Sequence, residues 1–537
     1  DKQYNEFTEK AFYFSEKNKA TLLLGKLAES KAKSFAGLPD SLLAQEQDLA
    51  KQIAQYQSLL LAAEIQDNAA QIPALKTALF DSKRQYEQLV AKFEKDFPQY
   101  HELKYNSKIV TIKDIQALLD AQTALIDYVV ADTSIYIFTI TNKTADIQVV
   151  KRDGNFDKIV TKFRNTIYYQ VGMMYVQTAH ELFEKYFPKN LPPKVKHLII
   201  IPDDVLHNVP FDALLTEAYK GEADKLDYSD LPYLIQDYDI SYHYSATLFL
   251  QNEVRQQKDK KEAVKKKVTE NYYVAFAPVF SDGRDSNLLL NSERLYYANE
   301  SALKAEQDNY NQFVAEYPDA LAAMKKQEEK ALQASHKNNK KHLAHIEQQR
   351  AFDRNGKHIT PLPQTAVEVE SITLHCNKKK LIAKSYLHEN AKEEVIKSGE
   401  LAAYQYIHFA THGLVNKVQP ELSGLLLAQN PESKEDGLLY IGEIYGLQLN
   451  AELVTLSACE TALGKLSKGE GVVGFTRAFM YAGAKNVLVS LWKVSDASTS
   501  EMMIEFYEQL IAGKSKAESL KRSKVALIKN KRFNKPY

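Results

Sequence analysis

Two short stretches in the last third of the chain constrain its fold most, because each reads as a buried strand that ends in a reactive side chain. Residues 405–413 run through apolar and aromatic residues to His412 and Gly413. Residues 453–462 run through Leu, Val and Thr to Cys459. A thiol needs a neighbouring base to act as a nucleophile at neutral pH, and imidazole is the usual one. We therefore hypothesise that Cys459 and His412 form a cysteine–histidine dyad.

Short β-type runs alternate with helical stretches from about residue 106 onward. Strands are expected at 124–130, 135–140, 147–150, 197–201, 240–245, 272–276, 381–383, 405–413, 424–427, 437–440, 453–458 and 486–492. Helices are expected at about 155–187, 368–376, 393–398, from 442, at 472–481 with Gly483 closing it, and after the loop 493–498. This alternation indicates an α/β fold with a largely parallel sheet.

The first hundred residues have a helical pattern instead. Apolar residues at 20–28 follow the spacing of an amphipathic helix, which residues 37–39 break. Asp40 suits the N-cap of a second helix, and a third follows Pro73 and stops at 97–98. Long helices with short connections favour a hairpin, the end of a helical repeat array, or a packing collar for the next domain.

Three domains are expected from the length of 537 residues and from these changes in pattern. They are a helical region at 1–105, an α/β unit at 106–270 and a second α/β unit at 271–537. A polar, helix-prone interval at 281–360 interrupts the second unit, and we interpret it as an inserted helical arm or a mobile loop. The basic run 258–267 is expected to be a solvated face, and the tyrosine and methionine cluster at 168–175 to belong to the core.

Composition excludes several classes of function. Lys and Arg together number 69, as do Asp and Glu, so no global charge favours binding to nucleic acid or a membrane. No apolar run reaches the roughly 20 residues of a membrane span, and no signal peptide is visible. The 2 cysteines suit a reducing cytoplasm. No cofactor fingerprint is present, and the start at Asp1 indicates a fragment or a processed form.

Rival interpretations of the reactive residues are weaker. His408 and His412 stand four apart, but the segment lacks the glutamate of the zincin pattern and a third ligand, so we expect no metal. If the segment is a strand, both histidines point to the same face. Cys376 shares a helix face with two apolar residues and is expected to be structural. Ser457 is a rival nucleophile without the usual nucleophile elbow. Backbone N–H groups of Cys459 and Gly413 are candidate oxyanion donors.

Five segments together resemble the CHAT domain, a caspase-like peptidase domain that is related to separase and often attached to TPR repeats. They are His-Phe-Ala-Thr-His-Gly at 408–413, Ser-Gly-Leu-Leu-Leu at 423–427, Leu-Ser-Ala-Cys-Glu-Thr-Ala at 456–462, Gly-Glu-Gly-Val-Val-Gly at 469–474 and Ser-Leu-Trp at 490–492. The resemblance is dense over 361–530 and weaker upstream, at 199–204 and 210–211. It implies a caspase-like three-layer α/β/α fold with a mostly parallel sheet, in an inactive amino-terminal half and an active carboxy-terminal half, preceded by an α-helical region.

The resemblance also implies a cysteine endopeptidase with His412 as base and Cys459 as nucleophile. In separase-like relatives an acidic residue after the strand at 486–492 selects a basic P1 side chain. Asp496 stands there in this chain, with Glu460 as a weaker alternative. A carboxylate is the natural partner of Arg or Lys, so we expect cleavage after these residues. Asp496 is equally suited to cap the final helix.

The expected partners are a protein substrate and a protein activator that engages the helical region. The interval 281–360 is longer than the family's usual connection, which suggests an autoprocessing or regulatory arm. No family-type aromatic strand follows Tyr537, which is consistent with a truncated or processed chain. Two other functions stay open at this point. One is a catalytically silent scaffold or signalling module, and the other is a cysteine hydrolase or acyltransferase that acts on small molecules.

Overall fold

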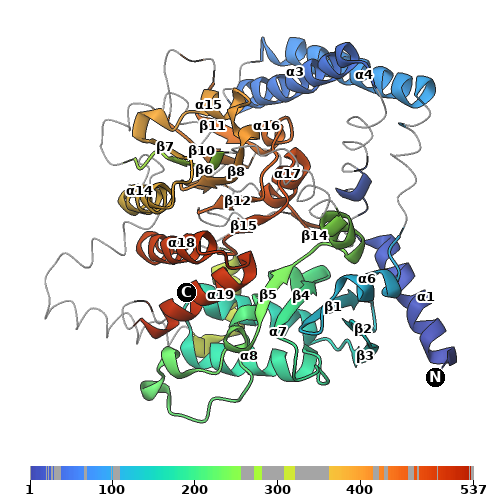
Figure 1. Ribbon diagram of the computed structural model, residues 1–537, viewed down its shortest axis with the longest axis vertical. Coiled ribbons are helices and arrows are strands. Elements are labelled where there is room, and N and C mark those ends of the chain that lie inside the picture. Colours follow the sequence, from blue (N-terminus) through green and yellow to red (C-terminus); the bar gives the residue numbers. More distant parts are fainter. Residues whose placement is uncertain are drawn as a thin grey trace, which may run out of the picture.

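The computed structural model contains two α/β units and a helical hairpin, as Figure 1 shows. It describes residues 2–19, 21, 23–25, 28, 38–65, 69–97, 100, 109–254, 271–280, 308–320, 362–414, 423–428, 433, 435–457, 465–467, 471–492, 494–530 and 533. Within these ranges, no helix combines the length and the apolar character that crossing a bilayer requires. The basic run 258–267 lies outside the described residues.

The amino-terminal region is helical, as its pattern predicted. Its helices are α1 (Lys2–Asn18), α3 (Asp40–Ile65) and α4 (Ile72–Asp96). Helix α3 begins at Asp40 itself, so Asp40 is its first residue and not the N-cap that we expected. Helix α4 carries Pro73 in its first turn, where a missing N–H costs nothing. Helices α3 and α4 lie side by side as a hairpin (Figure 1). Helix α1 packs elsewhere, on the first sheet.

The first sheet is mixed. Its strands are β1 (Thr123–Val130), β2 (Ser134–Thr141), β3 (Ala145–Lys151), β4 (His197–Ile201) and β5 (Asp239–Tyr242), in the order β3-β2-β1-β4-β5. Strand β1 is parallel to β4 but antiparallel to β2, and β3 is antiparallel to β2. The expectation of a largely parallel sheet is therefore wrong for β2 and β3, although β1, β4 and β5 are parallel. Residues 131–133 and 142–144 are turns too short for the crossover that parallel strands need.

Helices cover both faces of the first sheet. On one face lie α7 (Phe156–Tyr168) and α8 (Gly172–Tyr186), which form two helices where the sequence predicted one. The break follows from Gln170, whose φ of 61° is left-handed. On the other face lie α6 (Ile112–Leu118), α1 and a helix that begins at Ala246. The ring of Phe12 in α1 is fully buried there and meets Phe138 edge-on at 5.7 Å.

A buried polar contact fixes α1 to this sheet. The ammonium of Lys19, directly after α1, forms an ion pair with Asp127 of β1 and donates to the Tyr128 carbonyl at 2.7 Å. Lys19 and Asp127 are 4% and 0% exposed. Burial raises the pKa of Asp127 to about 7, and the Lys19 charge opposes that rise. The Glu16 carboxylate accepts the N–H groups of Ala246 and Thr247 at 3.0 and 2.7 Å, and so caps the helix that begins at Ala246.

We predict that Lys19→Met detaches α1. Removing one partner of a buried ion pair typically costs about 3–5 kcal/mol, because the other charge stays buried. The hydrogen-exchange protection factors of α1 amides should fall by about a hundredfold at pH 8. They should fall less at pH 6, because a protonated Asp127 needs no counter-charge. Lys10→Met, which breaks an exposed pair with Glu6, is the control and should leave protection unchanged. Equal effects of the two variants would contradict the prediction.

The described part of the interval 281–360, residues 308–320, is helical and docks on the first unit. Phe313 is buried and stacks on Tyr169 at 5.1 Å. Tyr310 meets the same ring at 5.5 Å, and the Lys162 ammonium lies 4.8 Å from the Tyr317 ring. The interpretation as a helical arm fits this segment. Of the tyrosine and methionine cluster at 168–175, Tyr169 and Met174 pack with the arm, whereas Tyr175 and Met173 belong to the core of the first unit, as expected.

The second sheet is parallel throughout. Its strands are β6 (Asn271–Ala277), β7 (Ala383–Leu387), β8 (Tyr404–Phe409), β12 (Leu453–Leu456) and β15 (Val487–Val489), in the order β15-β12-β8-β6-β7. A small antiparallel sheet of β9 (Gly413–Leu414), β10 (Gly424–Leu426) and β11 (Leu438–Tyr440) follows β8. A hairpin of β13 (Lys465–Ser467) and β14 (Gly471–Val473) follows β12.

Helices also cover both faces of this sheet. Helices α14 (Pro363–Lys378) and α18 (Asp496–Ile511) pack on one face. Helices α15 (Glu393–Lys397), α16 (Ile441–Ile444) and α17 (Phe475–Ala482) pack on the other. Helix α19 (Lys516–Lys529) packs on α18 and also on the first unit, beside β5 and α9 (Leu234–Asp237). The short turns of 3-10 helix are η1 (Asp204–Asn208), η2 (Phe211–Ala213), η3 (Ala223–Lys225), η4 (Tyr228–Asp230), η6 (His388–Asn390) and η7 (Glu400–Ala403).

Several predicted boundaries in this unit are wrong. The strand expected at 381–383 is β7, which runs over 383–387, and the strand expected at 486–492 is the shorter β15. The strand expected to reach residue 413 ends at Phe409. The helix expected at 472–481 begins at Phe475, because the two residues after Gly471 pair in β14. The final helix is two helices, and it begins at Asp496 rather than after 498. Gly483 does close α17, with a left-handed φ of 115° and a backbone packed so closely on Leu449 that no side chain fits.

Candidate functional site

The two candidate catalytic residues follow neighbouring strands at the same edge of the second sheet. Strands β8 and β12 are paired in parallel, with Phe409 opposite Leu456. His412 is the third residue after Phe409, and Cys459 is the third after Leu456. The carboxyl ends of parallel strands form the usual site edge of α/β sheets. Cys459 and Glu460 lie outside the described residues, so the pairing of the strands carries the argument for their position.

His412 is held in a narrow, nearly closed position. It is 4% exposed, and its ring lies 5.5 Å from the Phe280 ring at an angle of 33°. Its carbonyl accepts the Leu426 N–H at 2.9 Å, and the Thr411 hydroxyl donates to the Leu426 carbonyl. The segment after β8 is therefore clamped to β10 on both sides of the residue.

The backbone N–H of Gly413 points away from its partner strand. In an antiparallel ladder, hydrogen-bonded and non-bonded residue pairs alternate. Because the His412 carbonyl bonds to Leu426, the next pair, Gly413 opposite Leu425, is of the non-bonded kind. Its N–H is thus directed away from β10, and β9 is the outer strand of its sheet. This geometry is compatible with the role of an oxyanion donor.

Phe280 lies beside His412, and sequence reasoning missed both Val279 and Phe280. They follow β6 at the same sheet edge and have left-handed φ values of 66° and 53°. A β-branched residue in this conformation is strained, and such strain is found at functional sites. The Val279 carbonyl accepts the Leu362 N–H at 2.7 Å. The sequence offered one signal, Pro278, which interrupts the strand directly before this turn.

Asp496 serves a neighbouring helix. It is the first residue of α18, and Ser495 holds the N-cap position, which the sequence suggested for Asp496 as an alternative to the P1 pocket. One carboxylate oxygen accepts the Gln364 N–H at 3.0 Å, in the first turn of α14. Because Leu362 bonds to Val279, which adjoins Phe280 and so His412, Asp496 belongs to the same edge of the sheet. Asp496 is half-buried.

The two histidines of the motif have separate surroundings. Since β8 ends at Phe409, strand alternation does not place His412 on the face of His408. His408 is fully buried on the side of α14 and α18, where Tyr273 bonds to its ring. Cys376 is also buried there, and burial raises the pKa of its thiol to about 12, as expected of a structural cysteine.

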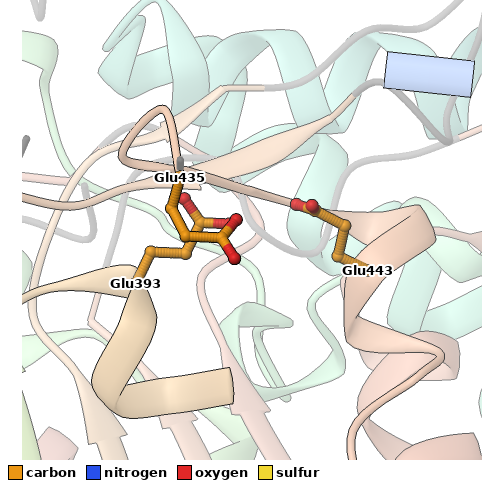
Figure 2. A group of neighbouring side chains, drawn as sticks. All are labelled: Glu393, Glu435 and Glu443. Atoms are coloured by element: carbon orange, nitrogen blue, oxygen red, sulfur yellow. The ribbon is translucent and has the colours of Figure 1, made fainter. Parts of the chain in front are cut away.

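Among the described residues, one group of three side chains has the spacing of metal ligands: Glu393, Glu435 and Glu443. Figure 2 shows the three carboxylates turned toward one another. The Lys397 ammonium lies 2.5, 2.6 and 2.7 Å from them, so the chain supplies its own cation. Burial and the nearby Glu443 raise the pKa of Glu393 to about 8. Burial alone would lower the pKa of Lys397, but the carboxylates raise it.

We predict that Lys397→Met destabilises this unit in a pH-dependent way. Without the ammonium, the buried carboxylates repel one another once Glu393 ionises. The loss of thermal stability should therefore grow as the pH rises through about 8, and should be smallest near pH 6. Melting temperatures at pH 6 and pH 9 measure it. Lys384→Met removes an exposed lysine paired with Glu400 and is the control. A pH-independent loss would contradict the prediction.

Comparison with known proteins places most of the chain in one family. The family model "CHAT domain" matches residues 176–537, from within α8 to the end of the chain. Tetratricopeptide repeat protein 28 of Mus musculus is 29% identical over 181 residues, which cover 27% of this chain and 7% of that protein. The Homo sapiens protein of the same name is 34% identical over 99 residues, which cover 18% of this chain and 4% of that protein. The chain thus spans only a small part of these curated relatives.

Proposed function

Because the chain belongs to the CHAT-domain family, which is grouped with caspase-like peptidases, we propose that it is a cysteine endopeptidase. One observation carries the proposal: His412 and the Cys459 position follow adjacent, directly paired strands at equal distance from the paired residues. In this proposal the second unit is the active caspase-like half. The first unit is the inactive half.

The proposed reaction proceeds through an acyl-enzyme. His412 takes the proton of the Cys459 thiol, and the thiolate attacks the scissile carbonyl carbon. The N–H groups of Gly413 and Cys459 bind the oxyanion of the tetrahedral intermediate. His412 then protonates the leaving amine as the peptide bond breaks. Water, activated by His412, attacks the thioester and releases the acid product and the free thiol. The direction of the Gly413 N–H away from β10 supports its part in this scheme.

We predict that Cys459→Ala and His412→Ala each lower kcat/KM for a protein substrate by at least about a thousandfold, because the two groups act as one unit. Mass spectrometry of products from a proteome incubated with each variant measures the loss. Ser457→Ala, which removes the rival nucleophile, is the control and should cleave like the wild type. Cleavage retained by Cys459→Ala would refute the proposal. If a peptide electrophile bearing P1 Arg labels no wild-type thiol under any condition, a catalytically silent scaffold becomes the better description.

We further propose that Asp496 selects Arg or Lys at P1. Its position after β15, on the edge that also carries His412, supports this role. Asp496 is half-buried, and its carboxylate carries a negative charge when ionised. One carboxylate oxygen accepts the Gln364 N–H in the first turn of α14. The charge of this carboxylate is the feature proposed to attract the substrate cation. Glu460 is the alternative, and it lies outside the described residues.

We predict different effects for two substitutions of Asp496. Asp496→Asn keeps an oxygen that accepts the Gln364 N–H but removes the charge. It should lower kcat/KM for P1 Arg and Lys peptides by about tenfold or more, with no change for peptides that have a neutral P1 residue. The melting temperature should stay unchanged. Asp496→Ala should lower both activity and stability. An unchanged P1 profile in Asp496→Asn would assign Asp496 to the support of α14 alone.

A protein activator that acts through the amino-terminal helices is the proposed partner. Two sets of contacts support this route. Leu23 is buried in a cluster with Leu248 of the first unit and Met480 of α17. Helix α17 follows the segment that carries Cys459, and the β13–β14 hairpin between them lies against η1 of the first unit. Displacing the helices would thus disturb that segment, and Lys19→Met, assayed for electrophile labelling of Cys459, tests this coupling.

A further inference from the structure

His408 occupies a buried polar site between the second sheet and its helices. It is 0% exposed, on β8, four residues before His412. The Tyr273 hydroxyl lies 2.8 Å from its Nδ1, and the Glu368 Oε1 lies 2.9 Å from its Nε2. The Tyr507 ring stacks on the imidazole at 5.5 Å and 22°. Both ring nitrogens and one ring face are therefore engaged by three different elements, β6, α14 and α18.

The surroundings of Glu368 determine which nitrogen carries the proton. Glu368 is 1% exposed, and within the described residues neither of its oxygens makes a hydrogen bond of good angle. Its Oε1 lies 2.9 Å from Nε2 of His408, which also makes no hydrogen bond of good angle within the described residues. A buried carboxylate is costly without a donor beside it, so the proton belongs on Nε2 and faces Glu368. The Tyr273 hydroxyl then donates to Nδ1, which fixes the orientation of the ring.

The site of His408 links the two strands that lead to the candidate catalytic residues, β8 and β12. His408 is paired with Ala275 of β6 on one side and with Thr455 of β12 on the other. The Thr455 hydroxyl is 2.8 Å from the Tyr507 hydroxyl, so β12 is tied to the same helix that covers His408. Thr455 precedes Cys459 by the same four residues that separate His408 from His412. Any tilt or slip of β8 is passed directly to the segment that carries His412.

We propose that His408 is a positioning residue for His412: its ring, held by Tyr273 and Glu368, fixes β8 so that its end presents His412 in one place. An apolar residue would fill the same space, but it would lack the hydrogen bond to Tyr273 of β6 and the close polar contact with Glu368 of α14. This inference deepens the proposed function. The expected effect on turnover depends on the proposed function, whereas the expected effect on β8 does not.

The test compares two buried tyrosines. Tyr273→Phe removes only the hydroxyl that bonds to Nδ1 of His408. Tyr128→Phe is the matched control, because it removes an equally buried hydroxyl, bonded to the Tyr186 carbonyl in the first unit. Neither variant leaves a large cavity, so both should fold. Glu368→Gln adds a conservative variant, which keeps an oxygen that accepts the Nε2 proton.

Hydrogen exchange of the peptide spanning 409–414, followed by mass spectrometry, is the first readout. Its Ala410 N–H bonds to the Phe276 carbonyl at 2.9 Å and reports the attachment of this segment to β6. Tyr273→Phe should speed this exchange by about tenfold, the usual cost of a buried group that loses its partner. Tyr128→Phe should leave it unchanged, and Glu368→Gln should stay within about twofold of the wild type. Unchanged exchange in Tyr273→Phe would overturn the proposal.

Turnover of a cleaved peptide is the second readout. Tyr273→Phe should lower kcat by about fivefold or more with KM within twofold, since a displaced His412 affects the chemical step and not substrate contacts. A rise in KM with kcat unchanged would count against a positioning role. If the wild type cleaves no substrate, the proposed peptidase function fails. The exchange of 409–414 still decides whether His408 holds the strand.

Discussion

The pairing of β8 with β12 is the constraint on which the rest of the second unit depends. Backbone bonds from Glu452 to Gln405 and from Ser457 to Phe409, at 2.7 and 2.8 Å, close the pairing at its two ends. A slip of one residue would turn every side chain to the other face and move His412 by about 3.3 Å along the strand. The fold prevents this slip by giving the two faces different contents. Phe409 and Leu456 enter an apolar core, whereas His408 and Thr455 face polar partners.

Strand cores were predictable from the sequence, but their ends were not. The apolar runs that became β1, β2, β8 and β12 are strong local signals. The end of β8 is set by distant groups, because Thr411 and His412 bond to Leu426 of β10 instead of continuing the ladder with β6 and β12. Strand β9 has two residues and no pattern to recognise. At the candidate site, the motif identified His412, while Glu368 passed unnoticed although it stands four residues before Ile372 on the apolar face of α14.

The packing units do not follow the order of the chain. Helix α1 covers the first sheet through Phe12, although α3 and α4 pack as a hairpin away from it. Helix α19, at the other end of the chain, also reaches the first unit, where Lys521 and Lys524 lie 3.6 and 3.3 Å from Asp239 and Asp212. The cause is the same in both cases. The first sheet has apolar surfaces that its neighbouring helices leave partly open, and helices from the two ends of the described chain complete them.

Buried charged groups mark the joints where these elements meet. Lys19 with Asp127 joins α1 to β1, Lys397 with its carboxylates joins α15 to α16 and the segment before β11, and His408 with Glu368 joins β8 to α14. A buried ion pair is weak evidence for stability, because desolvation offsets its attraction. A buried ion pair does, however, fix the relative position of the elements that it joins. An apolar contact tolerates sliding, whereas a charge that loses its one partner is left unsolvated, so each joint has a single acceptable geometry. In the second unit, the joint of His408 with Glu368 lies on the strand that leads to His412.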